Sequence, residues 1–311
     1  MTKAEQEALR VAKRYRRQLD RMEDDSARQL ASAFVILRNG IKEDMALLRE
    51  DSPDPLNFRY LRDVQPRVER RLRDYFRIAD RTMESLSRKA AEMGVNATDE
   101  QARWMFPDGG WSKVSIAGIF TGKIMSSAKD SLLSLPGTIT SRIQDLVGQA
   151  VGMAEQGLDW LMSQIGDTLG KAWGALQRLI RTTAERMFRQ AQQEQRKQTP
   201  ITYWRRVANH ETACLACLML EGHIYERQED FSDHPNGRCF IVPCEDNTDY
   251  GQPGKKWLEE QDEETQKRIM GKGRWEAWQN GDISLDQMTE LVNVPEYGMV
   301  PHVIPLRDLL P

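Results

Sequence analysis

The feature that most constrains the fold is a helical spacing of apolar residues that persists over most of the first 198 positions. Apolar side chains recur every three or four residues from Ala4 to Arg49, again from Leu61 to Ala90, and again from Ile139 to Ala191. This spacing places the apolar side chains on one face of a helix and most charged ones on the other. The sequence therefore predicts a mainly α-helical protein with long helices.

Residues 1–105 are predicted to form a long helical hairpin that binds a partner not identified by the sequence. The two prolines of Asp51–Pro55 are expected to end the first helix, because proline lacks an amide donor and has a fixed φ. Gly94 is expected to end the second helix. Thr98 and Gln101 have the spacing of a capping box, which predicts a short third helix from there to about residue 105.

The rest of the chain is predicted to form three further segments. Residues 106–138 are rich in glycine and serine and are expected to be an irregular connector that Pro136 and Gly137 end. Residues 139–198 are expected to be a long helical region, and residues 199–311 a small α+β module with acidic C-terminal helices. The expected strands of this module are Tyr203–Val207, His223–Tyr225 and Arg238–Val242, and its expected helices are Trp257–Ile269, Arg274–Gln279 and Leu285–Leu291.

The charge is unevenly distributed along the 311 residues, although the net charge is only -3. Residues 1–200 carry 33 basic and 27 acidic side chains, whereas residues 201–311 carry 11 basic and 20 acidic ones. A mildly basic first part followed by an acidic last part is typical of separate modules. The length allows about two domains.

The sequence predicts neither a membrane span nor an export signal. The longest stretch without Asp, Glu, Lys or Arg runs from Ser131 to Ser141, 11 residues, whereas a spanning helix needs about 20. Glycines at positions 148, 152, 166, 170 and 174 have the four-residue spacing of close-packed membrane helices, but glycines at helix crossings in an ordinary bundle are the favoured interpretation. A membrane-active ejection protein that uses residues 111–175 remains a minor alternative.

All four cysteines and three of the four histidines lie between positions 210 and 244. Cys214 and Cys217 form a C-x-x-C pair, which His234, Cys239 and Cys244 follow. In a reducing cytosol such a set is more often a metal site than a pair of disulfides. Four of these five residues would complete a zinc tetrahedron, with His234 and Cys239, or Cys239 and Cys244, as its second edge. Structural zinc and four plain thiols remain equal alternatives, and a catalytic metal is less favoured.

Enzymatic alternatives can be compared with the spacing of this cluster. A zinc deaminase is excluded, because the chain has no His-x-Glu and no proline before Cys214. An HNH-type nuclease would begin with a C-x-x-C followed by Asp233 and His234, as here, but its second C-x-x-C and its downstream Asn and His are missing. Neither G-x-G-x-x-G nor G-x-x-x-x-G-K-[ST] occurs.

The segment from Arg205 to Pro243 resembles the C-terminal signature of the MuF-like family of bacteriophage head-morphogenesis or minor head proteins. That signature has a Thr before a C-x-x-C, then a short turn with Gly, then a His-Pro-Asn-Cys-Arg-Cys block that leads into a strand. The sequence departs from it at Gly237, where the family usually has a cysteine that Cys244 would replace. The matching residues are Thr212, Cys214, Cys217, Leu220, Gly222, His234, Pro235, Asn236, Arg238 and Cys239.

The resemblance extends over roughly residues 140–311 and implies a function without enzymatic activity. Residues 179–186 are similar to the helix that precedes the cysteine module in the family, and residues 273–286 and 303–309 are similar to its tail. It implies a structural minor head protein in the virion, assembled in the host bacterial cytoplasm and present in several copies near the portal vertex. The implied roles are head morphogenesis, DNA packaging or genome delivery. The implied partners are the portal protein, the major capsid or scaffold protein and viral DNA, with no membrane.

Contact with DNA would need basic side chains that lie on one face of the helical hairpin. Because 19 acidic residues are interleaved with the basic ones in residues 1–100, a solvated surface with ion pairs between successive turns is the favoured interpretation. A metal-dependent nuclease built on Cys214, Cys217 and His234 remains the main functional alternative. The candidate DNA-contacting residues are Arg14, Arg16, Arg17, Arg67, Arg70, Arg71 and Arg73.

Overall fold

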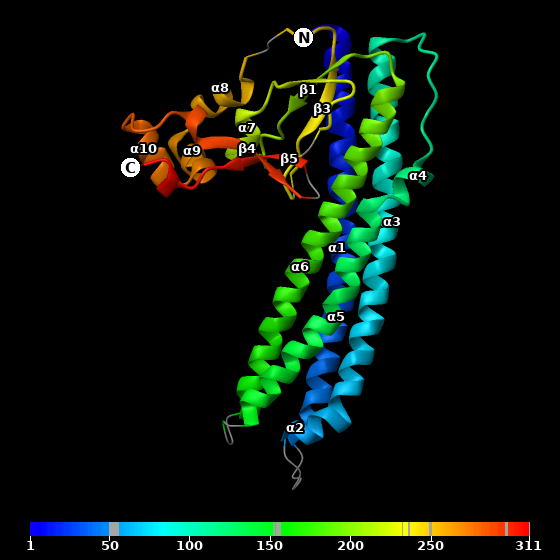
Figure 1. Ribbon diagram of the computed structural model, residues 1–311, viewed down its shortest axis with the longest axis vertical. Coiled ribbons are helices and arrows are strands. Elements are labelled where there is room, and N and C mark those ends of the chain that lie inside the picture. The colour runs from blue at the N-terminus through cyan, green and yellow to red at the C-terminus, as the bar shows by residue number, and fades with distance from the viewer. Residues whose placement is uncertain are drawn as a thin grey trace. The chain divides into compact units, whose positions relative to one another are not determined.

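The computed structural model describes residues 1–49, 56–151, 153, 157–231, 233–235, 237–248, 251–295 and 298–310. Long helices make up the first two thirds of the chain, and a smaller region with strands follows (Figure 1). The predicted fold class, mainly α with a small α+β Cys/His module, is confirmed. Within the described part of the chain, no helix is both long and apolar enough to cross a membrane.

Helices account for almost all of the described residues before position 199. The longest ones are α1 (Lys3–Ala46), α3 (Gln65–Met105), α5 (Lys123–Ala150) and α6 (Gly157–Gln198). The shorter elements are η1 (Leu47–Arg49), α2 (Leu56–Arg59), the π-helical turn η2 (Tyr60–Val64) and α4 (Ile116–Phe120).

The C-terminal region combines short helices with two small sheets. Its helices are α7 (Leu215–Met219), α8 (Pro253–Glu259), α9 (Glu263–Met270) and α10 (Lys272–Gln279), with 3₁₀ turns η4 (Leu285–Met288) and η5 (Leu306–Asp308). Its strands are β1 (Tyr203–Val207), β2 (Ile224–Glu226), β3 (Phe240–Cys244), β4 (Thr289–Val294) and β5 (Gly298–Val303).

The chain folds into two compact units, each built from segments that are distant in the sequence. The first unit comprises residues 1–19, 90–119 and 187–311, and the second comprises residues 20–89 and 120–186. Helices α1, α3 and α6 contribute residues to both units.

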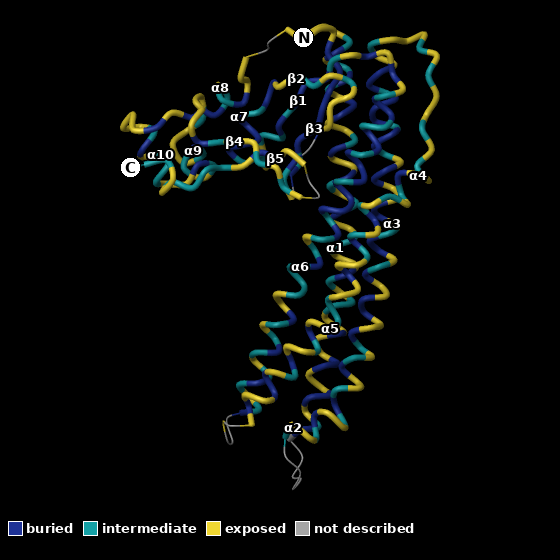
Figure 2. The backbone as a smooth tube through the Cα atoms, viewed as in Figure 1, coloured by how far each residue is buried: buried dark blue, intermediate teal, exposed yellow. Residues whose placement is uncertain are grey.

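The second unit is a helical bundle whose buried residues follow the predicted helical spacing (Figure 2). Phe34 of α1 stacks on Trp173 of α6, with ring centroids 5.2 Å apart, and meets the edge of Tyr75 of α3 at 5.9 Å. Arg71 of α3 also contacts Asp44 near the end of α1. These contacts show that α1 and α3 run antiparallel in this unit, as expected for a hairpin.

In the first unit, a three-stranded antiparallel sheet of order β2-β1-β3 packs with the helical segments of the same unit. Gln101 of α3 donates from Nε2 to the carbonyl oxygen of Ile241 in β3 at 3.2 Å. Ala12 of α1 packs against Phe240 and Val242 of the same strand. The fully buried Trp204 of β1 belongs to the core between the sheet and the short C-terminal helices.

Helix α3 continues through Gly94, so the prediction that Gly94 ends a helix and that Thr98 starts another is wrong. A Cβ atom at Gly94 would lie 2.3 Å from the carbonyl oxygen of Phe188 in α6. The glycine therefore permits close helix packing within a continuous helix. Thr98 is 1% exposed, which places it in the packed part of α3 rather than at a solvated helix start.

The predicted irregular connector at residues 106–138 is also wrong in its second half, where α5 runs from Lys123 through Pro136. Proline removes one backbone hydrogen bond from a helix interior. The apolar face continues on both sides of Pro136, with Leu132 and Ile139 buried, and this burial offsets the lost bond. The long region predicted at 139–198 consists of the end of α5 and of α6.

In the C-terminal module the three predicted strands are confirmed within two residues, whereas two helix predictions are wrong. The segment predicted as one helix from Trp257 to Ile269 is α8 and α9, because the Asp262 carboxylate accepts the Thr265 amide at 2.9 Å and starts a new helix. The predicted helix Leu285–Leu291 is the 3₁₀ turn η4 followed by β4, which pairs antiparallel with β5. The β-branched residues of β4 favour this hairpin.

Candidate functional site: a buried cysteine and histidine cluster

The candidate site lies in the first unit, where α7 meets the loop that leads into β3. Cys214 is the N-cap residue of α7 and Cys217 lies within its first turn, so their three-residue separation brings both sulfurs to the same side. His234 lies in the loop, and Cys239 directly precedes β3. Strand β3 pairs with β1, which fixes the start of β3 in the sheet.

The donor atoms lie at separations that suit a single small metal ion. The Nε2 atom of His234 is 3.3 Å from the Sγ of Cys214 and 3.3 Å from the Sγ of Cys217. A sulfur and a nitrogen on one tetrahedral zinc would be about 3.5 Å apart, from Zn–S of about 2.3 Å and Zn–N of about 2.0 Å. Cys217 also groups with Cys239 and Asp233, with donor atoms within 4.8 Å of one another. The cluster is compatible with a metal site.

The imidazole of His234 is oriented by its other nitrogen. Its Nδ1 lies 2.9 Å from the carbonyl oxygen of Pro235, which can only accept a hydrogen bond. Nδ1 therefore carries a proton, and Nε2 faces the two sulfurs. A backbone carbonyl that fixes the tautomer in this way is typical of metal-binding histidines. Hydrogen bonding with Cys217 raises the pKa of His234 to about 9.

Asp233 is the fully buried centre of the polar network behind the ligand atoms. Its carboxylate accepts from Nη2 of Arg206 at 3.0 Å and from Nη2 of Arg189 at 3.3 Å. It also accepts the backbone amides of His234 at 3.0 Å and of Cys239 at 3.3 Å. Although burial acts against ionisation, the positive charges of Arg206 and Arg189 lower the pKa of Asp233 to about 2. Asp233 thus positions two of the candidate ligands through their backbone.

The three thiols of the cluster differ in how easily they lose a proton. Hydrogen bonding with Cys217 lowers the pKa of Cys214, whereas the same hydrogen bond raises the pKa of Cys217. The pKa of Cys239 is raised well above the usual thiol value by its hydrogen bond with Cys217 and by burial. Arg206 also donates from Nη2 to the Sγ of Cys217 at 3.5 Å, which brings a cation next to the sulfurs.

The formal charges around the cluster match a divalent ion bound by three thiolates. Such an ion with three thiolates and one neutral imidazole has one net negative charge. Asp233 adds a second negative charge, and Arg206 and Arg189 together compensate both. The side chains of Asp233 and Arg206 are 0% exposed and that of Arg189 is 8% exposed, so this compensation matters.

Of the other predicted site residues, Cys244 lies outside the cluster. It is the last residue of β3, and it is opposite Tyr203. Five residues of extended chain separate Cys239 from Cys244 by about 16 Å, too far for both to bind one ion. Burial raises the pKa of Cys244 to about 12. Of the five candidate ligands, Cys244 is therefore the one that the structure does not bring to the cluster.

The remaining residues of the MuF-like signature lie around the cluster. Gly222 has φ of +95°, and its amide donates to the carbonyl of Arg206 at 3.0 Å, so it forms the turn that returns the chain to the sheet. Thr212 and Pro235 are exposed, and Arg238 is half-buried. Asn236 lies outside the described residues.

Gly237, the departure from the family signature, has a steric explanation. A Cβ atom there would lie 2.2 Å from Oδ2 of Asp233, so no side chain fits while Asp233 keeps its position. The carbonyl oxygen of Gly237 also accepts a hydrogen bond from Arg189. In this chain, position 237 contacts the carboxylate behind the cluster and offers no ligand.

Arg189 and Arg206 support the cluster although neither is among the predicted site residues. Arg206 lies in the middle of β1 between Arg205 and Val207, and Arg189 belongs to a helix with many other arginines. A basic residue inside a predicted short strand was the available signal, since strands of small modules rarely bury a charge without a partner.

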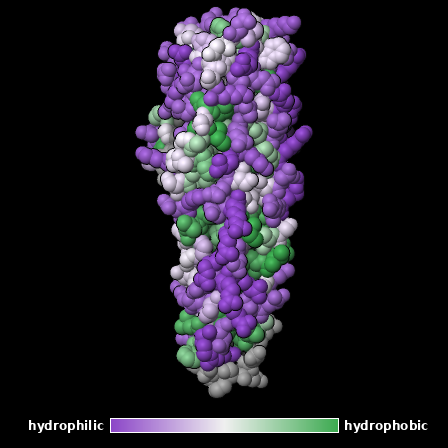
Figure 3. All heavy atoms as spheres, turned by 90° about the vertical axis from the view of Figure 1, so that its right-hand side faces the viewer, coloured by the Kyte–Doolittle hydropathy of each residue, from purple (hydrophilic) through white to green (hydrophobic). Residues whose placement is uncertain are grey.

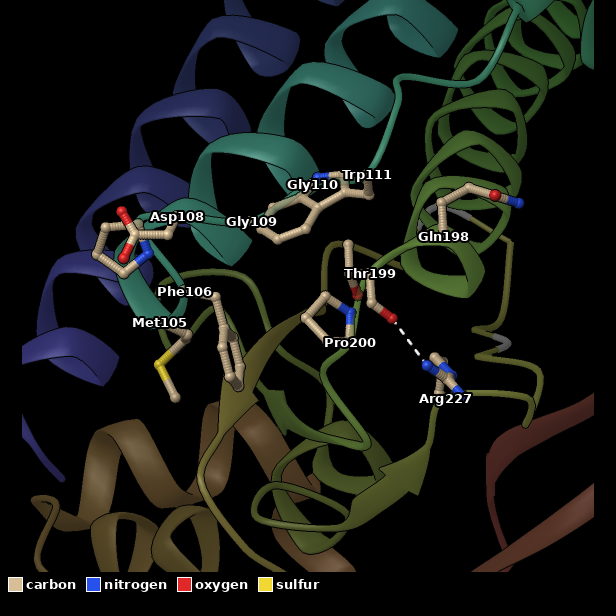
Figure 4. A pocket seen from close by; sticks show the side chains of 11 residues that line it. Met105, Phe106, Asp108, Gly109, Gly110, Trp111, Gln198, Thr199, Pro200 and Arg227 are labelled. Carbon is tan, nitrogen blue, oxygen red and sulfur yellow. Dashed lines mark hydrogen bonds between the residues drawn. The ribbon is translucent and has the colours of Figure 1, made fainter.

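A surface pocket of about 590 Å³ lies elsewhere in the first unit, where α3 and α6 end (Figure 4). The rings of Phe106, Trp111 and Pro200 surround it, and Arg227 donates from Nη1 to the carbonyl of Thr199 at 2.8 Å. The pocket shares no residue with the cysteine cluster. No function is proposed for this pocket.

Comparison of the chain with models of protein families, with curated proteins and with solved structures found no match.

Proposed function

We propose that this chain is a structural minor head protein of a tailed bacteriophage that is bound near the portal vertex. Its role would be head morphogenesis, DNA packaging or genome delivery. The observation that carries the proposal is the ordered resemblance of residues 205–243 to the MuF-like signature, from Thr212 to Cys239. Two overlapping groups of donor atoms support it: one consists of Cys214, Cys217 and His234, and Cys217 also groups with Asp233 and Cys239.

The cluster is proposed to hold a structural zinc ion through Cys214, Cys217, His234 and Cys239. Catalytic zinc sites keep a coordination position for water or substrate, whereas three thiolates and one imidazole fill all four positions. The burial of Cys217 and Cys239, 1% and 3% exposed, supports a closed site. Zinc would connect α7, the loop at His234 and the start of β3, and would add folding free energy to a small module.

This zinc role agrees with the proposed absence of enzymatic activity. The proposed partners are the portal protein and the major capsid or scaffold protein, with viral DNA as a further partner. The long helices support this choice because amphipathic helices offer extended faces for protein contacts. The proposed location is the virion.

The head assignment is tested with the phage or prophage that encodes the chain. Mass spectrometry of purified virions should find the chain in several copies per particle. Deletion of its gene should reduce the yield of DNA-filled or infectious particles, and expression of the intact gene from a plasmid should restore it. Particles that contain no copy of the chain would overturn the assignment.

A nuclease assay tests the main alternative. A metal-dependent nuclease built on Cys214, Cys217 and His234 would cut plasmid DNA in the presence of a divalent ion, and the His234→Ala variant would lose this activity. The proposed function predicts no cutting with magnesium, manganese or zinc. Cutting that disappears in His234→Ala would replace the structural proposal with the nuclease.

A further inference from the structure

The outward face of α3 in the second unit carries a line of arginines. Arg70, Arg77, Arg81 and Arg88 are all exposed. At 100° per residue, steps of 7, 4 and 7 residues keep them within about 20° of a single line along the helix. Arg67 and Arg73, also exposed, lie on either side of that line. The six arginines extend over about 32 Å, at 1.5 Å per residue.

The acidic residues on or beside this face are largely compensated. Asp74 pairs with Arg77 at 3.4 Å, and Glu69 pairs with Arg73 at 3.7 Å. Glu84 pairs with Lys129 of α5. Residues 65–89 contain eight basic and four acidic side chains, so the face keeps an excess of positive charge.

Three of the arginines remain available for a partner. Within the described part of the chain, Arg67, Arg70 and Arg81 have no hydrogen bond or ion pair with a protein group. Arg67 and Arg70, with Arg71, line a surface hollow of about 530 Å³ that Asp44 and Asp74 complete. Arg71 is held by Asp44, with Nε 2.6 Å from Oδ2. Of the cations that line the hollow, Arg67 and Arg70 are the ones without a hydrogen bond or ion pair to a described residue.

The composition of this face favours a nucleic-acid duplex over a protein partner. Protein interfaces have an apolar centre, whereas interfaces with DNA are more polar and much more positive. Ile78, 40% exposed, is the one large apolar side chain exposed between Arg67 and Arg88, a range that the structure describes in full. Figure 3 shows the side on which α3 lies in Figure 1, and in the lower half of this view hydrophilic side chains form a column with smaller apolar patches on either side.

Single-stranded nucleic acid is a poorer fit than a duplex. Proteins that bind single strands usually stack bases on exposed aromatic side chains. The two aromatic residues of this segment, Tyr75 and Phe76, are 4% and 6% exposed and belong to the core. The length of the arginine line, about 32 Å, is close to one turn of a B-form duplex, which is about 34 Å.

We propose that the outward face of α3 from Arg67 to Arg88 binds the phosphate backbone of double-stranded DNA without sequence preference. The guanidinium groups neutralise phosphates and release condensed counterions, which makes the affinity dependent on salt. This inference deepens the proposed function by naming a DNA-contacting surface. Its test uses purified full-length chain and synthetic duplex, so it can fail while virion mass spectrometry still supports the head assignment.

The test compares two triple variants that lose the same charge. In the first, Arg67, Arg70 and Arg81 are changed to glutamine. In the matched control, Lys256, Lys272 and Arg307 are changed to glutamine; these side chains are 79%, 78% and 85% exposed and belong to the C-terminal module. Binding to a fluorescent 30-base-pair duplex of random sequence is measured by anisotropy from 50 to 200 mM salt.

The intact chain is expected to lose affinity about 2,000-fold over this salt range, as for about six phosphate contacts. Arg73 and Arg77 are counted among the six because their exposed ion pairs stabilise little and can be exchanged for phosphates. The α3 variant should reduce this loss to about 40-fold, because three contacts fewer lower the salt slope by about 2.7. It should also bind at least about tenfold more weakly at 100 mM salt. The control should bind as the intact chain does, and replacing Arg67, Arg70 and Arg81 by lysine should retain binding.

Three outcomes would overturn the proposal. They are no binding at 50 mM salt, equal weakening by both triple variants, and tighter binding to a single strand of the same length than to the duplex. Far-ultraviolet circular dichroism and the thermal midpoint of each variant show whether it is folded. If the triple variant is unfolded, the single variants Arg67→Gln and Arg81→Gln provide the same comparison.

Discussion

Two groups of arginines in this molecule have opposite environments. Arg189 and Arg206 surround the carboxylate of Asp233, and all three side chains are buried. Arg67, Arg70 and Arg81 lie on the outward face of α3, exposed to solvent. In the first group the protein supplies the counter-charge, whereas in the second group the charge remains available to a partner.

The difference shows how burial determines what an arginine can do. A buried charge without a partner carries a large desolvation penalty, so the chain must place an opposite charge beside it. An exposed arginine is solvated by water, and its pairing with a carboxylate stabilises little. Arginine therefore has a structural role near Asp233, whereas on α3 it is exposed to a binding partner.

The largest expected effect is the loss of bound zinc when one ligand of the proposed site is removed. The intact chain should contain about one zinc per chain by elemental analysis, and the Cys239→Ser variant less than about 0.2, because a structural site needs all four ligands. Cys239→Ser should also unfold the C-terminal module at a lower temperature, since zinc binding contributes folding free energy.

Cys244→Ser is the matched control for this experiment. Cys239 and Cys244 are both 3% exposed, but only Cys239 lies in the cluster. Cys244→Ser should keep about one zinc per chain. Equal zinc contents in the two variants, or less than about 0.2 in the intact chain, would refute the structural zinc site.

The next largest effect is expected from removing the counter-charge of the buried arginines. Asp233→Asn removes the carboxylate that pairs with both Arg206 and Arg189 and should lower the free energy of unfolding by about 3–5 kcal/mol. Urea denaturation followed by tryptophan fluorescence measures this change. Asp246→Asn, at an exposed position, should leave the urea midpoint unchanged. A loss of less than about 1 kcal/mol for Asp233→Asn, the value of a surface pair, would contradict the comparison.

Apolar periodicity was sufficient to predict that the first 198 residues are mainly long helices, and short runs among turn residues predicted the three strands of the cysteine module, because both signals are local. The predictions failed where tertiary contacts override local signals. Gly94 and Pro136 are helix-breaking residues in isolation, yet both lie inside continuous helices. Gly94 is explained by the proximity of Phe188, and Pro136 by the buried apolar face on both sides of it.

The candidate ligands were predictable from residue type and spacing, but the buried charged residues that position them were not. The C-x-x-C pair and His234 are visible in the sequence and lie together in the structure. Arg189 reaches the cluster from a position 44 residues away from Asp233, and no local pattern encodes such a contact. The choice between Cys239 and Cys244 likewise depended on the pairing of β3 with β1.

Asp99 is intermediate between the buried and the exposed group of arginines. Its side chain is buried, but its basic partners Arg103 and Lys113 are half-exposed. It accepts from Trp111 Nε1 at 3.0 Å and from Arg103 Nε at 3.1 Å, and Lys113 lies 3.5 Å away. Although burial acts against ionisation, these groups lower the pKa of Asp99 below the usual value of an aspartate. Its stabilising contribution is therefore present above about pH 4 and is lost as the pH falls below that value.

This effect should be smaller than that of Asp233 because solvent screens the partners. At pH 6 the Asp99→Asn variant should unfold at a lower urea concentration than the intact chain. At pH 3 the two midpoints should approach each other, since the intact chain then loses the same charge. Midpoints that differ equally at both pH values would show that the charge of Asp99 contributes nothing.

The smallest effect on stability is expected on α3. Arg67→Gln and Arg70→Gln remove exposed charges that have no partner within the described part of the chain. Exposed substitutions of this kind usually change the free energy of unfolding by less than about 0.5 kcal/mol. Because removing these charges also reduces repulsion among the arginines of α3, the thermal midpoint at low salt should stay the same or rise slightly. A fall in that midpoint by several degrees, measured by circular dichroism, would mean that these arginines stabilise the bundle itself, and the contrast with Arg206 would then fail.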